Sequence, residues 1–312
     1  MTTAPHIRYC KRQEIDITRW DDLVRQTPNG LIYARSFFLD GITDGQWDAL
    51  VLDDYKAVMP LTWNKKFGIA YLHQPVYAAM LGVFGDPAEY TLPAFLKAIP
   101  PRFRLWDLDL NEGNNLLPDT GLRIKRTTRL NYFIPLDKSY EDLRKDYKRL
   151  ARRMTQKAAE SGLGIVRDTP PAEIIEHYRK AYGRRLAHIP AAHFRRLATC
   201  ATTAFATGHA ATYLARRPDN TIAAFYLVFS DHRFVYSTLG GSTDSGKEEG
   251  AFYLLTDAVL RDHCNTPRSF RFEGSDNRGI AFFNAQFGPY PVNYPHLLLN
   301  KLPFPLNLLK PR

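Results

Sequence analysis

The chain has 312 residues, of which 45% are hydrophobic and 13% aromatic, so it can bury a sizeable core and is not a disordered polypeptide. It has no run of about 18 apolar residues, no signal-peptide pattern and only three isolated cysteines, which excludes a disulfide framework or CxxC metal site and leads us to expect a cytoplasmic protein. The formal charge is +10, and its position along the chain matters more than its size.

The first half of the chain shows period-two strand patterns interrupted by short helical ones. Helices are predicted near 20–26 and 90–99, and strands at 47–52, 57–63, 68–77, 103–110 and 129–136.

A basic helix is predicted next. Ser139 and Asp142 fit a capping box at its start, and Gly162 ends it. Its apolar residues recur at steps of three and four, which would place them on one face: Tyr140, Leu143, Tyr147, Leu150 and Met154. Its cations form two rows on the exposed side: Arg144, Lys148 and Arg152, and Lys145, Arg149, Arg153 and Lys157.

The second half alternates strands and helices and repeats the hairpin of the first half, 47–62, at 211–229. Helices are predicted at 171–183, 190–206 and 251–264, and strands at 163–168, 211–216, 222–230, 233–240, 270–272 and near 292–300. We therefore expect an α/β fold with an α+β mixed sheet, in two similar domains at 1–136 and 137–312.

Net positive charge is confined to two stretches. Residues 122–129 carry a net charge of +4 and residues 144–157 a net charge of +6, so together they account for the whole +10. A solvated helix face is one reading. The other is a polyanion site, bound to nucleic acid, a nucleotide-linked substrate or an acidic membrane surface.

The stretch "FRFEGSDNRGIAFFNAQFG" (270–288) reads as a strand, a tight turn and an aromatic helix. Ser275 or Asp276 would cap the helix, and Ile280, Phe283 and Phe287 would pack inward. Glu273 stands at the carboxyl end of the strand, where open α/β sheets bind ligands. It is either a general base for an amine or a carboxylate that complements the helix dipole.

The stretch "GGSTDSGKEEGAF" (240–252) places glycines before a helix. Such a loop can present backbone N–H groups to phosphate, or it is simply flexible. Several other chemistries have no motif: there is no HExxH, GxSxG, Walker or GxGxxG pattern, so we expect no metal site.

Taken together, these motifs resemble the Fem-type branch of the GNAT acyltransferase superfamily. The resemblance rests on the basic helix, the three-strand meander, the glycine loop, and Phe272, Glu273, Gly274 and Ser275 followed by Phe287–Gly288. It implies two GNAT-like domains in tandem and transfer of an acyl or aminoacyl group to an amine. Acyl-CoA or aminoacyl-tRNA would be the co-substrate, with Lys247 and Gly250 at the cofactor loop, where Phe252 departs from the family pattern.

On this resemblance the catalytic residues would be Glu273, Tyr236 and Ser275, with Tyr236 or Ser275 donating to the leaving group or oxyanion. A phosphate-bearing or nucleotide-linked substrate would contact Lys148, Arg149, Arg152, Arg153, Asn277 and Arg278. The competing reading is a non-catalytic protein on a degenerate transferase scaffold, which recognises a polyanion through the basic helix.

Overall fold

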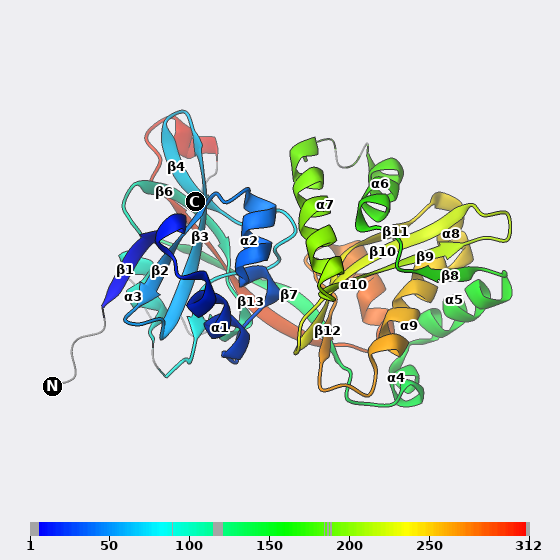
Figure 1. Cartoon of the computed structure of the whole chain (residues 1–312). Helices are drawn as coiled ribbons and strands as arrows, with labels where there is room; N and C mark the ends of the chain where they lie inside the picture. Colours follow the sequence, from blue (N-terminus) through cyan, green and yellow to red (C-terminus); the bar gives the residue numbers. More distant parts are fainter. Residues whose placement is uncertain are drawn as a thin grey trace. The chain divides into compact units, whose positions relative to one another are not determined.

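The structure is a computed structural model that describes residues 6–88, 90–114, 121–183, 185, 187 and 189–309. The chain forms two compact units (Figure 1): unit 1 comprises Met1–Arg129 and Asn293–Arg312, and unit 2 comprises Leu130–Val292. The sequence predicted one domain over 137–312. The structure instead returns the last twenty residues to unit 1, because the final strand pairs there with β6.

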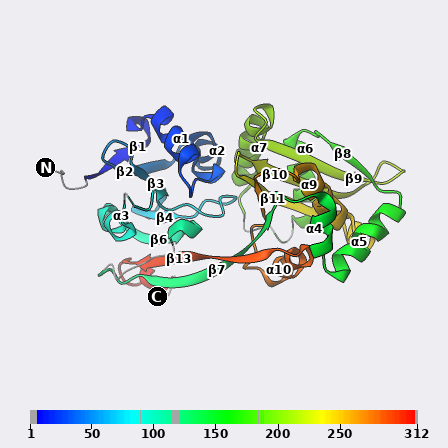
Figure 2. The same ribbon diagram turned by 90° about the horizontal axis from the view of Figure 1, so that it is seen from below.

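The described residues of unit 1 form a sheet with three α-helices and several short 3-10 helices. Its elements are β1 (Ile7–Lys11), η1 (Arg12–Glu14), α1 (Ile17–Gln26), η2 (Ile32–Ala34), α2 (Ser36–Thr43), β2 (Trp47–Leu52), β3 (Ala57–Lys66), β4 (Ile69–His73), β5 (Phe84–Gly85), α3 (Leu92–Ala98), β6 (Phe103–Asp109), η3 (Glu112–Asn114), β13 (Tyr290–Asn300) and η5 (Leu306–Leu309). The strand order is β1-β2-β3-β4-β6-β13, in which the β4–β6 pair is parallel and the other four pairs are antiparallel. The boundaries between the units fall within two strands, β13 and β7 (Lys125–Pro135). These two strands are neighbours in the sheet (Figure 2).

Unit 2 is a sheet with helices on both faces. Its elements are β7, α4 (Tyr140–Asp146), α5 (Arg149–Glu160), β8 (Gly164–Arg167), α6 (Pro171–Tyr182), α7 (Ala191–Ala206), β9 (Ala210–Arg216), β10 (Ile222–Ser230), β11 (Phe234–Ser242), α8 (Asp244–Glu249), α9 (Ala251–His263), β12 (Ser269–Arg271), α10 (Arg278–Asn284) and η4 (Ala285–Phe287). The order is β7-β12-β11-β10-β9-β8, and only β11–β12 is parallel.

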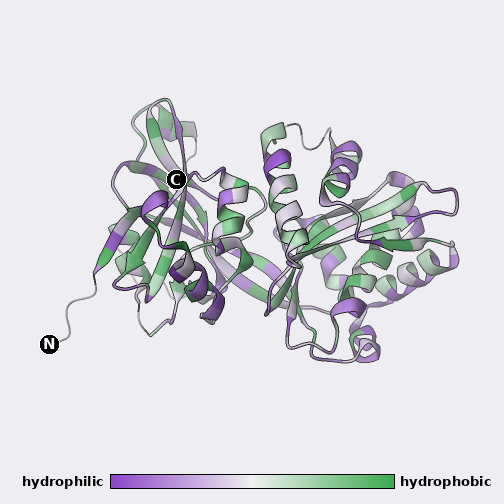
Figure 3. Cartoon of the chain, in the orientation of Figure 1, coloured by the Kyte–Doolittle hydropathy of each residue, from purple (hydrophilic) through white to green (hydrophobic). Residues whose placement is uncertain are grey.

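The core of unit 2 lies between its sheet and α9. In Figure 1, α6 and α7 cover one face of the sheet, and α5 and α9 cover the other. The hydropathy colours of Figure 3 show apolar residues along β10 and β11, which are buried almost throughout. Burial of these β-branched and aromatic side chains stabilises the fold by about 25 cal/mol per Å² of apolar surface.

The basic helix is divided in two. Tyr147 has extended backbone angles and ends α4, and Lys148 begins α5 as its N-cap. Ser139 caps α4 as predicted, because its side chain accepts from the N–H of Asp142. The prediction of one continuous apolar face is therefore wrong after the break. The buried residues of α5 are Ala151, Thr155 and Ala158, and not the predicted Leu150 and Met154.

Both units carry the same strand pattern. In each, an antiparallel meander is followed by one parallel strand and then by an antiparallel strand. The repeated hairpin of the sequence corresponds to β2–β3 and β9–β10. The predicted α/β class with a mixed sheet is thus confirmed.

Candidate functional site

The candidate site opens where two parallel strands of unit 2 part. β11 and β12 pair over only three residues, ending at Tyr236 and Arg271. Beyond this point β11 continues to Ser242, while the chain after β12 turns away at Phe272. A β-bulge at Thr238 displaces the register with β10 at the same level. A bulge of this kind redirects the local backbone and side chains.

A cavity of about 730 Å³ fills the space between the parted strands. One wall comes from β11, a second from the turn after β12 with α10, and a third from α6 and the start of α9. Its lining is rich in aromatic side chains: Tyr178, Tyr182, Phe252, Tyr253, Phe272 and Phe283. A volume of this size suits a drug-sized or cofactor-sized ligand.

Two consecutive glycines let aromatic rings approach β11 from both faces. A Cβ on Gly240 would lie 2.5 Å from the ring of Phe252, and one on Gly241 would lie 2.4 Å from Oη of Tyr182. Oη of Tyr182 also accepts from the N–H of Ser242 at 3.2 Å. The glycines are therefore needed here for close packing along the cavity wall.

Glu273 lies in the cavity wall in a fixed orientation. Its φ of +54° is unusual for a residue other than glycine. Its N–H donates to Oδ1 of Asn131 at 2.9 Å, and Nδ2 of Asn131 donates to its Oε2 at 2.7 Å. Nε of Arg271 donates to its Oε1 at 3.0 Å. Backbone strain of this kind persists where the surroundings over-determine it, and it is frequent in active sites.

Arg271 is fully buried, although it carries a charge. Its guanidinium carbon lies 4.4 Å from the ring centroid of Phe133, 4.9 Å from that of Phe234 and 5.7 Å from that of Tyr236. The aromatic faces and the Glu273 carboxylate together compensate for the loss of hydration. The Glu273 carboxylate therefore lies beside a guanidinium and an amide, and not in the purely aromatic surroundings that the general-base role assumed.

The helix after the turn is capped by Asn277 and not by Ser275 or Asp276. Oδ1 of Asn277 accepts from the N–H groups of Gly279 and Ile280. Oδ1 of Asp276 instead accepts from the N–H of Leu130, and Oγ of Ser275 accepts from Nδ2 of Asn284. These three side chains fasten the turn to β7 and α10.

Tyr236 and Ser275 do not line the cavity, which corrects their expected position in the cleft. Tyr236 is buried on the face of β11 opposite to Ser237, and its hydroxyl donates to Oδ2 of Asp231 at 2.6 Å. Ser275 is 3% exposed, and its hydroxyl is bound to Asn284. Since successive strand residues point to opposite faces, Ser237 is the residue of this pair that faces the cavity.

The glycine loop is largely helical. Residues 244–249 form α8, Thr243 caps it, and Gly250, with φ of +79°, joins it to α9. Lys247 and Gly250, which the resemblance assigns to a cofactor loop, both line the cavity. A Cβ on Gly250 would lie 2.5 Å from the carbonyl oxygen of Met154, so α5 crosses this junction closely.

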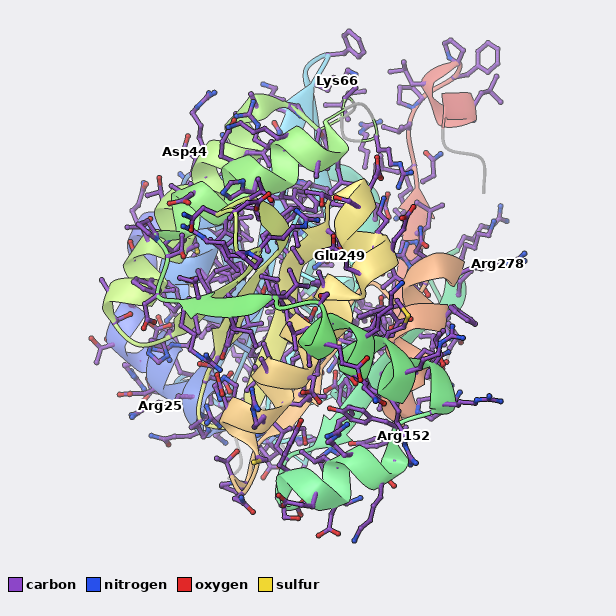
Figure 4. All side chains as sticks on the ribbon, turned by 90° about the vertical axis from the view of Figure 1, so that its right-hand side faces the viewer. Arg25, Asp44, Lys66, Arg152, Glu249 and Arg278 are labelled. Carbon is purple, nitrogen blue, oxygen red and sulfur yellow. The ribbon has the colours of Figure 1, made fainter. Side chains whose placement is uncertain are left out.

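The cations of α5 lie beside the cavity and not in its lining. Lys148, Arg149, Arg152 and Arg153 are all exposed. Nζ of Lys157 donates to the carbonyl of Glu248, two residues before Gly250, at 2.7 Å. Burial raises the pKa of Tyr253 in the cavity wall, and the charge of Arg153 opposes this rise. Figure 4 shows Arg152 and Arg278 reaching outward, and Arg278 likewise lies outside the lining.

The equivalent gap in unit 1 is filled by the chain itself. β4 and β6 form a parallel pair that ends at His73 and Asp107. The chain after His73 then runs beside the end of β6. The N–H of Leu81 donates to the carbonyl of Asp109 at 2.8 Å, and Met80, Leu81 and Val83 are buried. Within the described parts of the chain, the open gap between parallel strands therefore occurs in unit 2.

Among the described residues no group of three or more His, Cys, Asp or Glu side chains could hold a metal ion. Within the same residues no helix is long and apolar enough to cross a membrane.

Comparisons with known proteins identify the fold. No protein-family model matches the sequence, and no curated protein matches it either. Solved structures do match. FemX aligns with 98% of this chain and 99% of its own, with a TM-score of 0.68 at 12% identity. L-PGS from Bacillus licheniformis aligns with 94% of this chain and 95% of its own, with a TM-score of 0.56 at 10% identity.

A tandem GNAT protein from the clavulanic acid biosynthesis pathway covers 96% of this chain and 99% of its own, with a TM-score of 0.55 at 12% identity. The fold is therefore that of a GNAT-type protein with two such units in one chain. Within that class the fold is Fem-like. The resemblance inferred from the sequence is confirmed at the level of the fold.

Several residues around the site were not identified from the sequence, among them Asn131, Arg271, Tyr182 and Asn284. Asn131 lies 142 residues before Glu273, in a strand whose sequence pattern showed no functional motif. Arg271 interrupts a buried aromatic strand, and this irregularity is the signal that could have revealed a partnered charge.

Proposed function

We propose that the protein is an N-acyltransferase or aminoacyltransferase whose reaction takes place in the unit 2 cavity. One observation carries the proposal: the parallel strands β11 and β12 part to form an open cavity with a fixed carboxylate in its wall. The transferase-like scaffold supports this reading.

The reaction is a substitution at an activated carbonyl. The acceptor amine attacks the carbonyl carbon of the donor, a C–N bond forms, and the C–S or C–O bond to the carrier breaks. The amine loses one proton and the carrier gains one, so the step balances without an external reagent. Glu273 would bind the attacking amine through its carboxylate, whose two oxygens offer about four acceptor positions in all.

The donor carrier would lie at the cationic end of the cavity. Lys247 and Arg185 both line it, and the first turn of α9 begins beside them at Gly250. The N-terminus of a helix favours negative charge, so a phosphate-bearing carrier such as an acyl-CoA or an aminoacyl-tRNA fits this end. Arg153 and Lys157 of α5 would extend the contact beyond the cavity.

Turnover with a donor panel tests the proposal. Purified protein is incubated with acyl-CoAs and aminoacyl-tRNAs and a panel of amines, and new amide is detected by mass spectrometry. Glu273→Gln should lower kcat/KM by about 100-fold through loss of a charged contact to the amine. Glu248→Gln, at an exposed carboxylate, is the matched control. Amide formation that is equal in both variants would contradict the role of Glu273.

A second candidate is a protein that binds a polyanion through α5 without catalysis. It is favoured by the exposed cations of α5, none of which lines the cavity. Binding of this kind weakens steeply with salt and is lost in Arg149→Ala/Arg153→Ala but kept in Glu273→Gln. A catalytic role is distinguished by turnover that Glu273→Gln lowers while binding remains.

A further inference from the structure

One end of unit 1 combines exposed apolar side chains with exposed lysines and arginines. Phe67 is 76% exposed, Phe304 is 80% exposed and Leu308 is 65% exposed, which makes them the three most exposed large hydrophobic side chains among the described residues. Single exposed apolar residues need no explanation, but three of them at one end of a sheet indicate a surface that has a partner.

The topology brings these residues to the same end. β3 and β4 are antiparallel, so their connecting turn with Phe67 lies at the start of β4. β4 and β6 are parallel, so the start of β6 lies beside it, where Ala70 pairs with Phe103. β13 is antiparallel to β6, so its end lies there too, and the N–H of Lys301 donates to the carbonyl of Arg104.

Figures 1 and 4 show the tip of β3–β4 and the segment after β13 projecting on the same side of unit 1.

The basic stretch 122–129, which the unit 2 cavity does not use, belongs to this end as well. β7 lies next to β13. β7 begins in unit 1 and β13 ends there, so the start of β7 lies beside the end of β13 (Figure 2). The exposed cations of this end are Lys65, Lys66, Arg104, Arg123, Lys125, Arg126 and Lys301, together with Arg102, which pairs with Asp48. Residues 63–71, 102–106, 121–128 and 300–309 contain no acidic residue.

We propose that this end of unit 1 docks onto the surface of a membrane that contains anionic lipids. Phenyl and leucyl side chains would enter the boundary between headgroups and acyl chains, while the lysines and arginines would contact lipid phosphates. Lys66 already lies over the ring of Phe67, with Nζ 5.5 Å from its centroid, so the cation and the apolar group are presented together. Each cation near an anionic surface adds favourable electrostatic free energy.

A bilayer explains the apolar tips better than a nucleic acid does. A nucleic-acid duplex would use the cations but would leave Phe304 and Leu308 exposed to water, because its bases are already stacked on one another. The proposal is independent of the transferase activity, because no residue of this surface lines the unit 2 cavity.

Vesicle sedimentation of the full chain tests the proposal. The wild type should sediment with vesicles of equal parts phosphatidylglycerol and phosphatidylcholine, and not with phosphatidylcholine alone. Phe67→Ser/Phe304→Ser should weaken binding by about tenfold or more, because two apolar side chains no longer enter the interface. Lys65→Ser/Lys66→Ser should also weaken vesicle binding. The weakening should resemble that caused by added salt, which screens the same charges.

The matched control is Phe282→Ser, which removes a phenyl ring 61% exposed in unit 2. It should leave vesicle binding unchanged. Because Phe67 and Phe304 are exposed, their replacement keeps the thermal melting temperature, which is checked for each variant. The proposal is overturned if the wild type does not bind the anionic vesicles, if Phe282→Ser and not Phe67→Ser/Phe304→Ser removes binding, or if the cations prove to bind RNA but no vesicles.

Discussion

Asn131 is the residue on which the orientation of Glu273 depends most. It is 1% exposed, and it both accepts from the backbone of Glu273 and donates to its carboxylate. Asn131→Leu would leave a buried N–H and a buried carboxylate oxygen without this partner. We expect a loss of about 2–4 kcal/mol in the free energy of unfolding, measured by urea denaturation. Asn64→Leu, at an exposed strand position, should change it by less than about 0.5 kcal/mol.

His263 at the end of α9 should make stability depend on pH. Burial lowers its pKa from 6.5 to about 4, and neither ring nitrogen has a hydrogen-bond partner in the described part of the chain. The unfolded state then binds more protons between pH 4 and 6.5, so stability falls as pH falls through this window.

At pH 5 this effect amounts to about 2 kcal/mol relative to pH 7, from a shift worth 1.36 kcal/mol per pKa unit. Urea denaturation of His263→Leu at both pH values should show a smaller loss than the wild type. His232→Leu, at an exposed turn, is the control. An equal loss in wild type and His263→Leu would show that other groups cause the acid sensitivity.

The turn and helix after β12 form one element whose start is set by Asn277. Asn277→Ala removes the cap of α10 and should cost about 1 kcal/mol of stability. Amide exchange in residues 273–284 should speed up more than in β10. Arg278→Ala, which changes an exposed residue of the same helix, should leave exchange unaltered.

The end of β11 is coupled to α6 through Gly241 and Tyr182. In Gly241→Ala the new Cβ would meet Oη of Tyr182 at 2.4 Å, so we expect a cost of about 1–3 kcal/mol. In a Tyr182→Ala background the same substitution should cost far less. A double-mutant cycle measures this coupling, and additive effects would mean that the two residues do not touch.

The sequence identified most elements because their periodicity is local. Phe270, Phe272 and Phe287 are buried as their spacing predicted. The break between α4 and α5 was missed, because the pattern of three and four continues across Tyr147 while the backbone does not. Ile280 is 46% exposed, although its spacing placed it inward, since the cavity lies where a packed wall was expected.

At the scale of the molecule, the two units share one strand pattern but differ in the segment that comes after the parallel pair. In unit 1 the segment around Leu81 fills the gap, and in unit 2 the gap remains open. The predicted domain limit at 136 could not anticipate β13, because its pairing with β6 joins residues almost two hundred positions apart. Pairing between strands so far apart in the chain leaves no periodic signal in a single sequence.

Glu273, Lys247 and Gly250 were singled out by motif, and all three line one cavity. Asn131, Arg271 and Tyr182 were not, because each reaches the site from a strand or helix whose own pattern is only that of a packed element. Tyr236 was misplaced because its position in β11 does not reveal which face of the strand borders the cavity, and its neighbour Ser237 takes that face.

Amide hydrogen exchange with a donor bound tests the central claim most directly. The full chain is compared with and without each acyl-CoA or aminoacyl-tRNA that supports amide formation. We predict protection in residues 237–242, 250–253 and 272–274, around the unit 2 cavity, and no change in residues 78–83 of unit 1. Protection of residues 78–83 with none around the cavity would contradict the claim that the transfer site lies between β11 and β12.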